Sequence, residues 1–283
     1  MSTPATGGRS LSKSVAVGLL LGAVFLLSVL IYKELFVVLA AAAAGAGAWE
    51  LSSALRLKGW YVPRVPAVVG SVLIMPAAFY GGAELQWLVS LGIVAALIFW
   101  RTVHLLWEAR EAPRQAIAHT LRDYAASAFV VIYLPLMTSF TMLLLRRPDG
   151  AAWVITFVVT VAMIDTSGYL VGRKLGKHKL APGVSPKKTW EGLVASISAG
   201  VVSAVLLTQL FWGFDWWIGL VLAGVLLLAA VFGDLAESLI KRDLGVKDMS
   251  SLLPGHGGIM DRLDSILPSA LITYLFAQIF LPL

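Results

Sequence analysis

The chain has 283 residues, of which 59% are hydrophobic and 13% charged, and its mean hydropathy is +0.85. Soluble domains carry roughly 25% charged residues, so this composition excludes an ordinary soluble domain and indicates an integral membrane protein. The chain has no cysteine, which excludes disulfides, thiolate metal sites and cysteine nucleophiles. Its net charge of +6 does not indicate nucleic-acid binding, because the basic residues lie in short segments between apolar runs.

The N-terminal segment, residues 1–14, is small, polar and rich in glycine, and we expect it to form a cytoplasmic tail. The apolar run that follows, 15–32, could be a cleavable signal peptide. We favour a retained helix, because a second apolar run begins after only a short turn at Lys33 and Glu34.

Apolar runs long enough to cross a membrane recur along the whole chain. A transmembrane helix needs about 17–25 mostly apolar residues, and the runs predict an all-α, polytopic integral membrane protein of about nine transmembrane helices. Their approximate bounds are 15–32, 35–55, 65–81, 85–107, 124–145, 151–172, 192–212, 216–240 and 263–282. We expect a single membrane domain, 15–283, with N-terminal helices in 15–145 and the catalytic part in 151–283.

The basic residues favour one orientation of these helices. With the N-terminus in the cytoplasm, all of the 22 Lys and Arg residues except Lys33, Arg146 and Arg147 lie on the cytoplasmic side. An excess of Lys and Arg marks the cytoplasmic loops of membrane proteins. We therefore expect the N-terminus and the two most polar loops to be cytoplasmic.

The first of these polar loops, 165–192, begins with an acid inside an apolar helix. That acid is Asp165, and an ionisable residue within a membrane span indicates a functional role. Beyond it lysines and arginines alternate with glycines, a composition that lets cations and backbone approach phosphate. The spacing does not match a Walker A loop, and a basic turn that only holds anionic lipid is the alternative.

The sequence SPKKTWEG in this loop predicts the start of a helix. Ser185 or Thr189 can cap the helix, with Glu191 in its first turn. A helix start that carries hydroxyls and lysines is also a ready phosphate site, so Lys187 and Lys188 are candidate phosphate-binding residues.

The second polar loop, 238–264, mixes acids and cations between two strongly apolar runs. Charges beside hydrocarbon are usually paired, metal-bound or hydrated. Just before and inside this loop, Asp234, Glu237, Ser238 and Lys241 follow the i, i+3, i+4, i+7 spacing and should share one face of a helix.

Asp261 and Asp264 are three residues apart at the start of the last helix and should also be neighbours. They can meet Asp234 only if the intervening loop folds back, which its Pro-Gly-His-Gly-Gly sequence allows. Converging carboxylates beside cations fit Mg²⁺, which takes oxygen ligands and shares them with substrate phosphates. The alternative is that these acids only form ion pairs with the neighbouring lysine and arginines.

The second loop also carries a specific set of residue types. They are Ser238-x-Ile240-Lys241-Arg242, Lys247-Asp248, Pro254-x-His256-Gly257-Gly258 and Asp261-Arg262-x-Asp264. This set resembles the signature of the phosphatidate cytidylyltransferases, the CDP-diacylglycerol synthases, and 165–192 resembles the basic segment of that family. The resemblance implies a polytopic α-helical enzyme of phospholipid biosynthesis that makes CDP-diacylglycerol and pyrophosphate from CTP and phosphatidate. It also implies Mg²⁺, a second, monovalent cation such as K⁺, a homodimer, and a bacterial inner (plasma) membrane.

The resemblance places the metal-binding acids of the family at Asp234 and Asp261. The residues expected to act in catalysis are Asp234, Asp261, Lys241, Arg242 and Asp264. Those expected to bind substrate are Ser185, Lys187, Lys188, Thr189, Ser238, His256, Gly257, Gly258, Arg262 and Asp165. An oxygen of the lipid phosphate would attack the α-phosphorus of CTP, so charge neutralisation by metal and cations is the main catalytic task.

Two alternatives remain open from the sequence. A CTP-dependent lipid kinase would use similar parts but would transfer the γ-phosphoryl group and release CDP. A cation-coupled transporter, with Asp165, Glu191, Asp234 and Asp261 as an ion path, predicts acids near the bilayer midplane, whereas these acids lie towards the cytoplasmic ends of the spans. The expected partners are CTP, phosphatidate and membrane lipid, and no nucleic acid.

Overall fold

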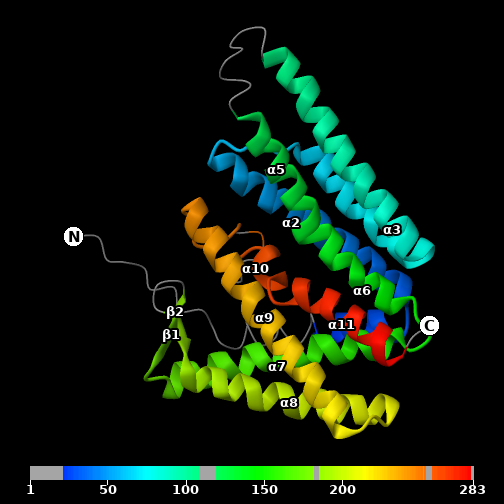
Figure 1. Cartoon of the computed structure of the whole chain (residues 1–283), viewed down its shortest axis with the longest axis vertical. Coiled ribbons are helices and arrows are strands. Elements are labelled where there is room, and N and C mark those ends of the chain that lie inside the picture. Colours follow the sequence, from blue (N-terminus) through cyan, green and yellow to red (C-terminus); the bar gives the residue numbers. More distant parts are fainter. Residues whose placement is uncertain (1–21, 109–118, 182–184, 251, 253–256, 282–283) are drawn as a thin grey trace.

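The computed structural model describes residues 22–108, 119–181, 185–250, 252 and 257–281. These residues are almost entirely helical (Figure 1), which confirms the predicted all-α class. Residues 22–30 form a helix within the first predicted span. The predicted cytoplasmic tail, 1–14, lies outside the described residues.

Seven helices among the described residues are long and apolar enough to cross a membrane. They are α2 (Lys33–Leu57), α3 (Arg64–Glu108), the run α5–η1–α6 (Thr120–Leu145), α7 (Gly150–Leu175), α8 (Trp190–Trp212), α9 (Trp216–Leu244) and the run α10–α11 (Met260–Phe280). The two runs divide into α5 (Thr120–Val131), η1 (Ile132–Leu136), α6 (Met137–Leu145), α10 (Met260–Leu263) and α11 (Ile266–Phe280). Helices suit a bilayer because each backbone N–H and C=O bonds within its own segment.

The 45-residue element α3 contains two of the predicted spans, 65–81 and 85–107. A straight helix of that length would measure about 67 Å, roughly twice the thickness of the hydrocarbon core. Gly82 interrupts it with φ 73° and ψ −163°, and Figure 1 shows α3 as a helical hairpin. A Cβ at Gly82 would overlap the guanidinium of Arg146, so the turn needs glycine for both its backbone angles and its space. The total of nine transmembrane helices stays a prediction.

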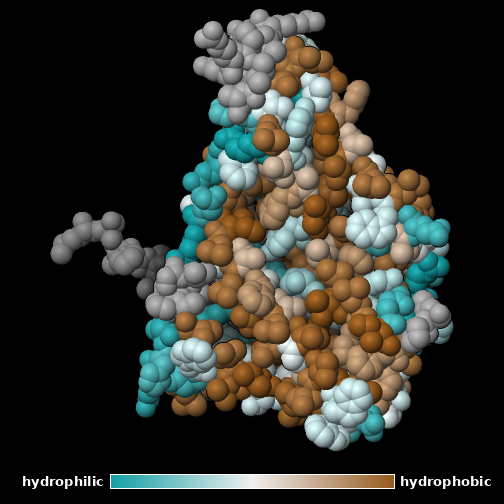
Figure 2. All heavy atoms as spheres, viewed as in Figure 1, coloured by the Kyte–Doolittle hydropathy of each residue, from teal (hydrophilic) through white to brown (hydrophobic). Residues whose placement is uncertain are grey.

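A broad apolar surface covers the middle of the molecule, with hydrophilic residues gathered at two opposite edges (Figure 2). Large apolar side chains are exposed on the molecule, including Leu88 at 66%, Phe99 at 70% and Leu210 at 74%. Exposure of this kind is unfavourable in water at about 25 cal/mol per Å² but is ordinary contact with lipid in a bilayer. The surface therefore agrees with a multi-pass membrane protein.

The three basic residues that the predicted topology puts outside the cytoplasm all have structural contacts. Lys33 Nζ donates a hydrogen bond to the carbonyl of Arg147 at 3.3 Å, and Arg147 Nη2 donates to the carbonyl of Leu281 at 2.6 Å. Arg146 packs against Gly82. Contacts within the protein account for the positions of these three basic residues. Their place outside the cytoplasm therefore does not conflict with the predicted orientation.

The loop between α7 and α8 contains a small β-hairpin that the sequence did not predict. Strand β1 (Lys179–Ala181) pairs antiparallel with β2 (Ser185–Thr189), with Lys179 opposite Thr189 and Ala181 opposite Ser185. The hairpin leads directly into α8 and lies at the opposite side of the molecule from the C-terminus (Figure 1). It fixes the backbone of the lysine-rich segment.

Helices α7 and α8 lie side by side (Figure 1), and glycines let them approach closely. A Cβ at Gly192 in α8 would lie 2.7 Å from the carbonyl oxygen of Gly168 in α7. One at Gly200 would lie 2.9 Å from the side chain of Ile164. Small residues are common at helix contacts in membranes, where close packing drives association. This contact holds the start of α8 against the segment of α7 that carries Asp165.

Candidate active site

A cavity of about 810 Å³ lies at the hairpin end of α7 and α8. Predicted site residues that line it are Asp165, Lys188, Thr189, Asp234, Asp261, Arg262 and Asp264. Polar lining residues that the prediction did not include among the site residues are Tyr169, Arg173, Lys179, Ser196 and Ser265. The cavity thus joins the two polar loops that the sequence singled out separately.

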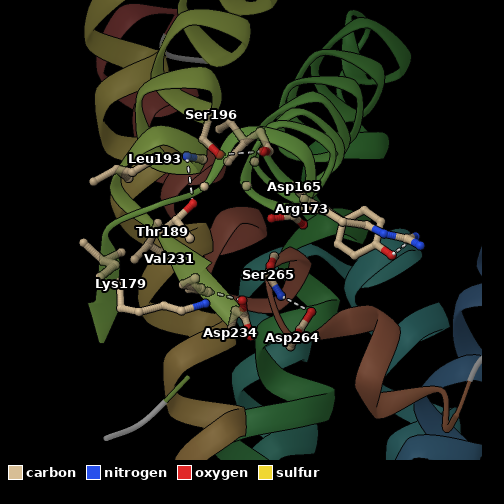
Figure 3. A pocket seen from close by; sticks show the side chains of 18 of the residues that line it. Asp165, Arg173, Lys179, Thr189, Leu193, Ser196, Val231, Asp234, Asp264 and Ser265 are labelled. Carbon is tan, nitrogen blue, oxygen red and sulfur yellow. Dashed lines mark hydrogen bonds and ion pairs between the residues drawn. The ribbon is translucent and has the colours of Figure 1, made fainter. Parts of the chain in front are cut away.

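Three of the four carboxylates that line this cavity come from separate parts of the chain and lie around Ser265. Asp165 belongs to α7, Asp234 to α9, and Asp264 follows α10 directly. Figure 3 shows them gathered around Ser265, whose backbone N–H donates to Asp264 Oδ1 at 2.7 Å. Asp234 Oδ2 lies 2.6 Å from Lys188 Nζ. Like charges that crowd into a partly buried space repel each other, so this arrangement favours a bound cation.

Lys241 in α9 joins the two acidic segments. Its Nζ lies 2.7 Å from Glu237 Oε2 and 2.8 Å from Asp261 Oδ1. The other oxygen of Asp261 accepts hydrogen bonds from the backbone N–H groups of Met249, at 2.9 Å, and Gly258, at 2.8 Å. The side chain of Asp261 is only 5% exposed. Because Met249 and Gly258 lie at opposite ends of the loop between α9 and α10, Asp261 binds both ends of this loop.

The Gly257-Gly258 pair meets two separate requirements. Gly257 has φ +83°, in the left-handed region that residues with a Cβ rarely adopt. A Cβ at Gly258 would lie 2.6 Å from Glu50 Oε2. The first glycine is needed for its backbone conformation and the second for its lack of a side chain.

Glu50 is a polar residue of this region that the prediction missed. It lies in α2 and is 4% exposed. Its Oε1 accepts hydrogen bonds from the Ser250 hydroxyl at 2.5 Å and the Ile259 N–H at 3.0 Å, and its Oε2 accepts from the Met260 N–H at 3.0 Å. An acid within the apolar run 35–55 was a signal that could have found it. Only the tertiary structure shows what the acid binds.

The start of α8 uses one of the two predicted caps. Thr189 Oγ1 accepts the backbone N–H three residues later at 3.1 Å, whereas Ser185 belongs to β2. Glu191 lies in the first turn, as predicted, and its Oε1 is 2.7 Å from His178 Nδ1. Together these contacts fix the turn from strand to helix directly after Lys188.

The other predicted site residues lie around the cavity or outside the described residues. The Ser238 hydroxyl is 3.4 Å from Asp234 Oδ1, and Arg242 is in the last turn of α9. Lys187 belongs to β2. His256 lies outside the described residues. The functional roles of these residues stay predictions.

The donor set fits a hard divalent cation. Such a cation, Mg²⁺ in particular, is usually held by one or two carboxylates together with water and substrate phosphates. Asp165, Asp234 and Asp264 offer oxygen ligands in one cavity. In the part of the chain that the structure describes, no group of three or more His, Cys, Asp or Glu side chains is arranged to hold a metal by itself. The site therefore suits a cation that is shared with a phosphate ligand.

Comparison with known proteins agrees with this combination of fold and site. The model of the cytidylyltransferase family matches residues 12–280, so the chain belongs to this family of nucleotidyltransferases. The chain is similar to the phosphatidate cytidylyltransferase of Mycobacterium leprae (strain TN), with 38% identity over 277 residues that cover 94% of this chain and 87% of that protein.

Other relatives carry the same name. The phosphatidate cytidylyltransferase of Mycobacterium bovis (strain ATCC BAA-935 / AF2122/97) is 34% identical over 272 residues, 95% of this chain and 88% of that protein. That of Brucella abortus biovar 1 (strain 9-941) is 40% identical over 145 residues, 50% of this chain and 54% of that protein. The family that the signature residues predicted is thereby confirmed.

Proposed function

We propose that this chain transfers the cytidylyl group of CTP to phosphatidate and forms CDP-diacylglycerol and pyrophosphate. The observation that carries the proposal is the cavity in which lysine, arginine and four carboxylates meet at one end of a bundle of apolar helices. The mycobacterial relatives are phosphatidate cytidylyltransferases by name. The family match supports neither a lipid kinase nor a transporter.

In the proposed reaction an oxygen of the phosphatidate phosphate attacks the α-phosphorus of CTP. A phosphorus–oxygen bond forms there while the bond to the oxygen that bridges to the β-phosphate breaks, and its electron pair leaves with pyrophosphate. Both reactants are anions, so the protein must neutralise charge and align the attacking and leaving oxygens. No protein nucleophile is required, in keeping with a chain that has no cysteine.

The cations around the cavity would neutralise the phosphates. Those that line it are Arg173, Lys179, Lys188 and Arg262. Lys187 and Arg242 were predicted for the same task and belong to the adjoining β2 and α9. Lys241 is bonded to two carboxylates, and we assign it the task of holding Asp261 in place.

We propose that one or two of the carboxylates of Asp165, Asp234 and Asp264 would hold the divalent cation, Mg²⁺, together with a substrate phosphate. When bound, Mg²⁺ would offset the negative charge on the phosphate oxygens. Asp261 was also predicted as a metal ligand, but its oxygens accept bonds from Lys241 and from two backbone N–H groups. We propose that it acts by fixing the loop before α10. The monovalent cation and the homodimer that the family resemblance implies belong to the same proposal.

We propose that the hairpin end faces the cytoplasm of a bacterial plasma membrane. The distribution of Lys and Arg supports this orientation, and the relatives named above are bacterial. CTP would then arrive from the cytoplasm, and phosphatidate would enter sideways from the bilayer. The exposed rings of Tyr169, at the cavity, and Trp190, at the start of α8, offer contacts at such a membrane boundary.

Pyrophosphate release by the purified protein in detergent tests the proposal. Release should require CTP, phosphatidate and Mg²⁺, and it should fall at least about 100-fold in Asp234→Asn, which removes a charge that faces the phosphates. Asp215→Asn is the matched control, since Asp215 precedes α9 about 28 Å along the helix from Asp234, and this variant should keep its rate within about twofold. Release of CDP in place of pyrophosphate would contradict the proposal in favour of a kinase.

A further inference from the structure

We infer that Glu50 is a positioning residue of the active site, which holds the two ends of the loop between α9 and α10 in place from the N-terminal half of the chain. The effect of Glu50 on the reaction rests on the proposed function, whereas its contacts with the loop do not. Glu50 lies in α2, almost 200 residues before the loop that it binds.

Among the residues that the structure describes, the hydrogen bonds to the Glu50 carboxylate come from the two ends of this loop. Ser250 donates from the end that follows α9, and Ile259 and Met260 donate from the end that begins α10. A carboxylate that is 4% exposed is costly to bury without such donors, so the loop and the acid stabilise each other. Glu50 thereby ties the two ends of the loop to α2.

The same two loop ends also bind Asp261, one residue earlier in each case. Met249 and Gly258 donate backbone N–H bonds to Asp261 Oδ2, while the next residues, Ser250 and Ile259, donate to Glu50. Neighbouring donors thus alternate between an acid of the cavity and an acid of α2. Without Glu50, the two loop ends would be held only by Asp261. Asp261 lies three residues before Asp264, which accepts the Ser265 N–H.

The kinetic test compares Glu50→Gln with the wild-type enzyme. Glutamine keeps the size of the side chain, but its amide replaces one acceptor oxygen with a donor that faces a backbone N–H. We expect kcat to fall at least about tenfold while KM for CTP stays within about twofold, because the residue orients the loop without contacting the nucleotide. Ser250→Ala removes one of three donors and should have a smaller effect of the same kind.

The matched control removes a buried hydrogen bond elsewhere. Ser139→Ala deletes the 2.6 Å bond from Gln86 Nε2, which joins α3 to α6 away from the loop. Both residues are fully buried. This variant should keep kcat within about twofold even if it lowers stability.

A second readout, thiol labelling, needs no substrate. It is specific to an introduced cysteine, because the chain has none of its own. Met260→Cys places a single thiol at a fully buried position at the start of α10, and Met142→Cys places one at a fully buried position in α6. With Glu50→Gln added, maleimide labelling should accelerate at least about tenfold at position 260 and should not change at position 142, since only the loop opens.

Loss of kcat together with selective labelling at position 260 supports the inference. A Glu50→Gln variant with kcat within about twofold of wild type, or with labelling that rises equally at both positions, overturns it, because the acid would then be dispensable or merely structural. If the wild-type chain releases no pyrophosphate, the proposed function fails, while labelling still decides whether Glu50 holds the loop.

Discussion

Lys241 joins α9 to α10 through ion pairs with two carboxylates. It pairs with Glu237, whose side chain is fully buried, and with Asp261, which lies twenty residues further along the chain. Removal of one partner from a buried ion pair leaves an uncompensated charge, so this lysine affects both stability and the shape of the site.

Lys241→Met should therefore lower the free energy of unfolding by about 3 kcal/mol and abolish pyrophosphate release. Methionine keeps most of the length of the side chain but leaves two carboxylates unpaired. Chemical unfolding in detergent, followed by circular dichroism, measures the change in stability. Lys247→Met changes an exposed lysine of the next loop and should alter stability by less than about 0.5 kcal/mol. Equal stability of the two variants would refute the role of Lys241.

The lack of a side chain at Gly258 leads to a second prediction at the scale of single residues. In Gly258→Ala the new methyl group would lie 2.6 Å from Glu50 Oε2, so the loop must shift. We expect a loss of about 1–3 kcal/mol in stability, together with a fall in activity. Gly224→Ala is the control, because nothing lies within 4 Å of the added methyl group in α9. This change should be neutral or stabilise the helix by up to about 1 kcal/mol. Thermal unfolding and pyrophosphate release of both variants provide the comparison.

At the scale of elements, the β-hairpin and the first turn of α8 form one unit. The Trp190 N–H donates to the carbonyl of His178 at 3.0 Å, and Glu191 binds the side chain of the same histidine. Thr189 caps the helix from the last position of β2. The unit carries Lys188 to the acids of α9, so its geometry should control the binding of phosphates.

Thr189→Ala removes the cap and should destabilise the protein by about 1 kcal/mol. Because the cap fixes the turn beside Lys188, the KM for CTP should rise as well. Thr189→Ser keeps the hydroxyl and should retain most of the affinity, which separates loss of the hydrogen bond from loss of the methyl group. Steady-state kinetics of the two variants measure this, and an equal rise of KM in both would show that the cap is not responsible.

At the scale of the whole molecule, a polar network closes the bundle at the end opposite the site. Asp149, just before α7, accepts hydrogen bonds from Trp153 Nε1 at 2.7 Å, Trp212 Nε1 at 2.9 Å and Arg147 Nε at 3.1 Å. Arg147 also donates to the carbonyl of Leu281, after α11. The network joins α7, α8 and α11 at the ends that lie away from the cavity.

This network predicts a dependence of stability on pH. Burial alone would raise the pKa of Asp149, but hydrogen bonds from Trp212, Arg147 and Trp153 outweigh it and hold the pKa below its usual value of 3.8. A lowered folded-state pKa means that the ionised acid stabilises the fold above pH 3.8, and that this contribution is lost as the pH falls through the lower value.

Asp149→Asn should therefore lower the melting temperature at neutral pH, and the difference from wild type should shrink as the pH falls below 3.8. Melting curves of both proteins across this range measure the effect. Trp212→Phe removes one of the donors and should show a smaller difference at neutral pH. A difference that does not change with pH would mean that the charge of Asp149 does not stabilise the fold.

The sequence by itself determined the class of fold, because a run of about 20 apolar residues in a bilayer must satisfy its backbone as a helix. It also predicted where the chemistry lies, since acids such as Asp165 and Asp234 are costly beside hydrocarbon and stand out from apolar surroundings. Local spacing predicted a cap at Ser185 or Thr189, of which the structure uses Thr189, and the shared face of Glu237 and Lys241, because these contacts depend on local geometry.

Only the tertiary structure decided which faces of the helices meet. Leu88 is 66% exposed and Leu144 is fully buried, yet the sequence does not distinguish them, because lipid is as apolar as a protein core. The binding of Glu50 to Met260, 210 residues away, depends on such contacts between helices. The same holds for the ion pair of Lys188 with Asp234 and for the backbone N–H groups that bind Asp261. The sequence indicated these residues as candidates but did not show which of them are in contact.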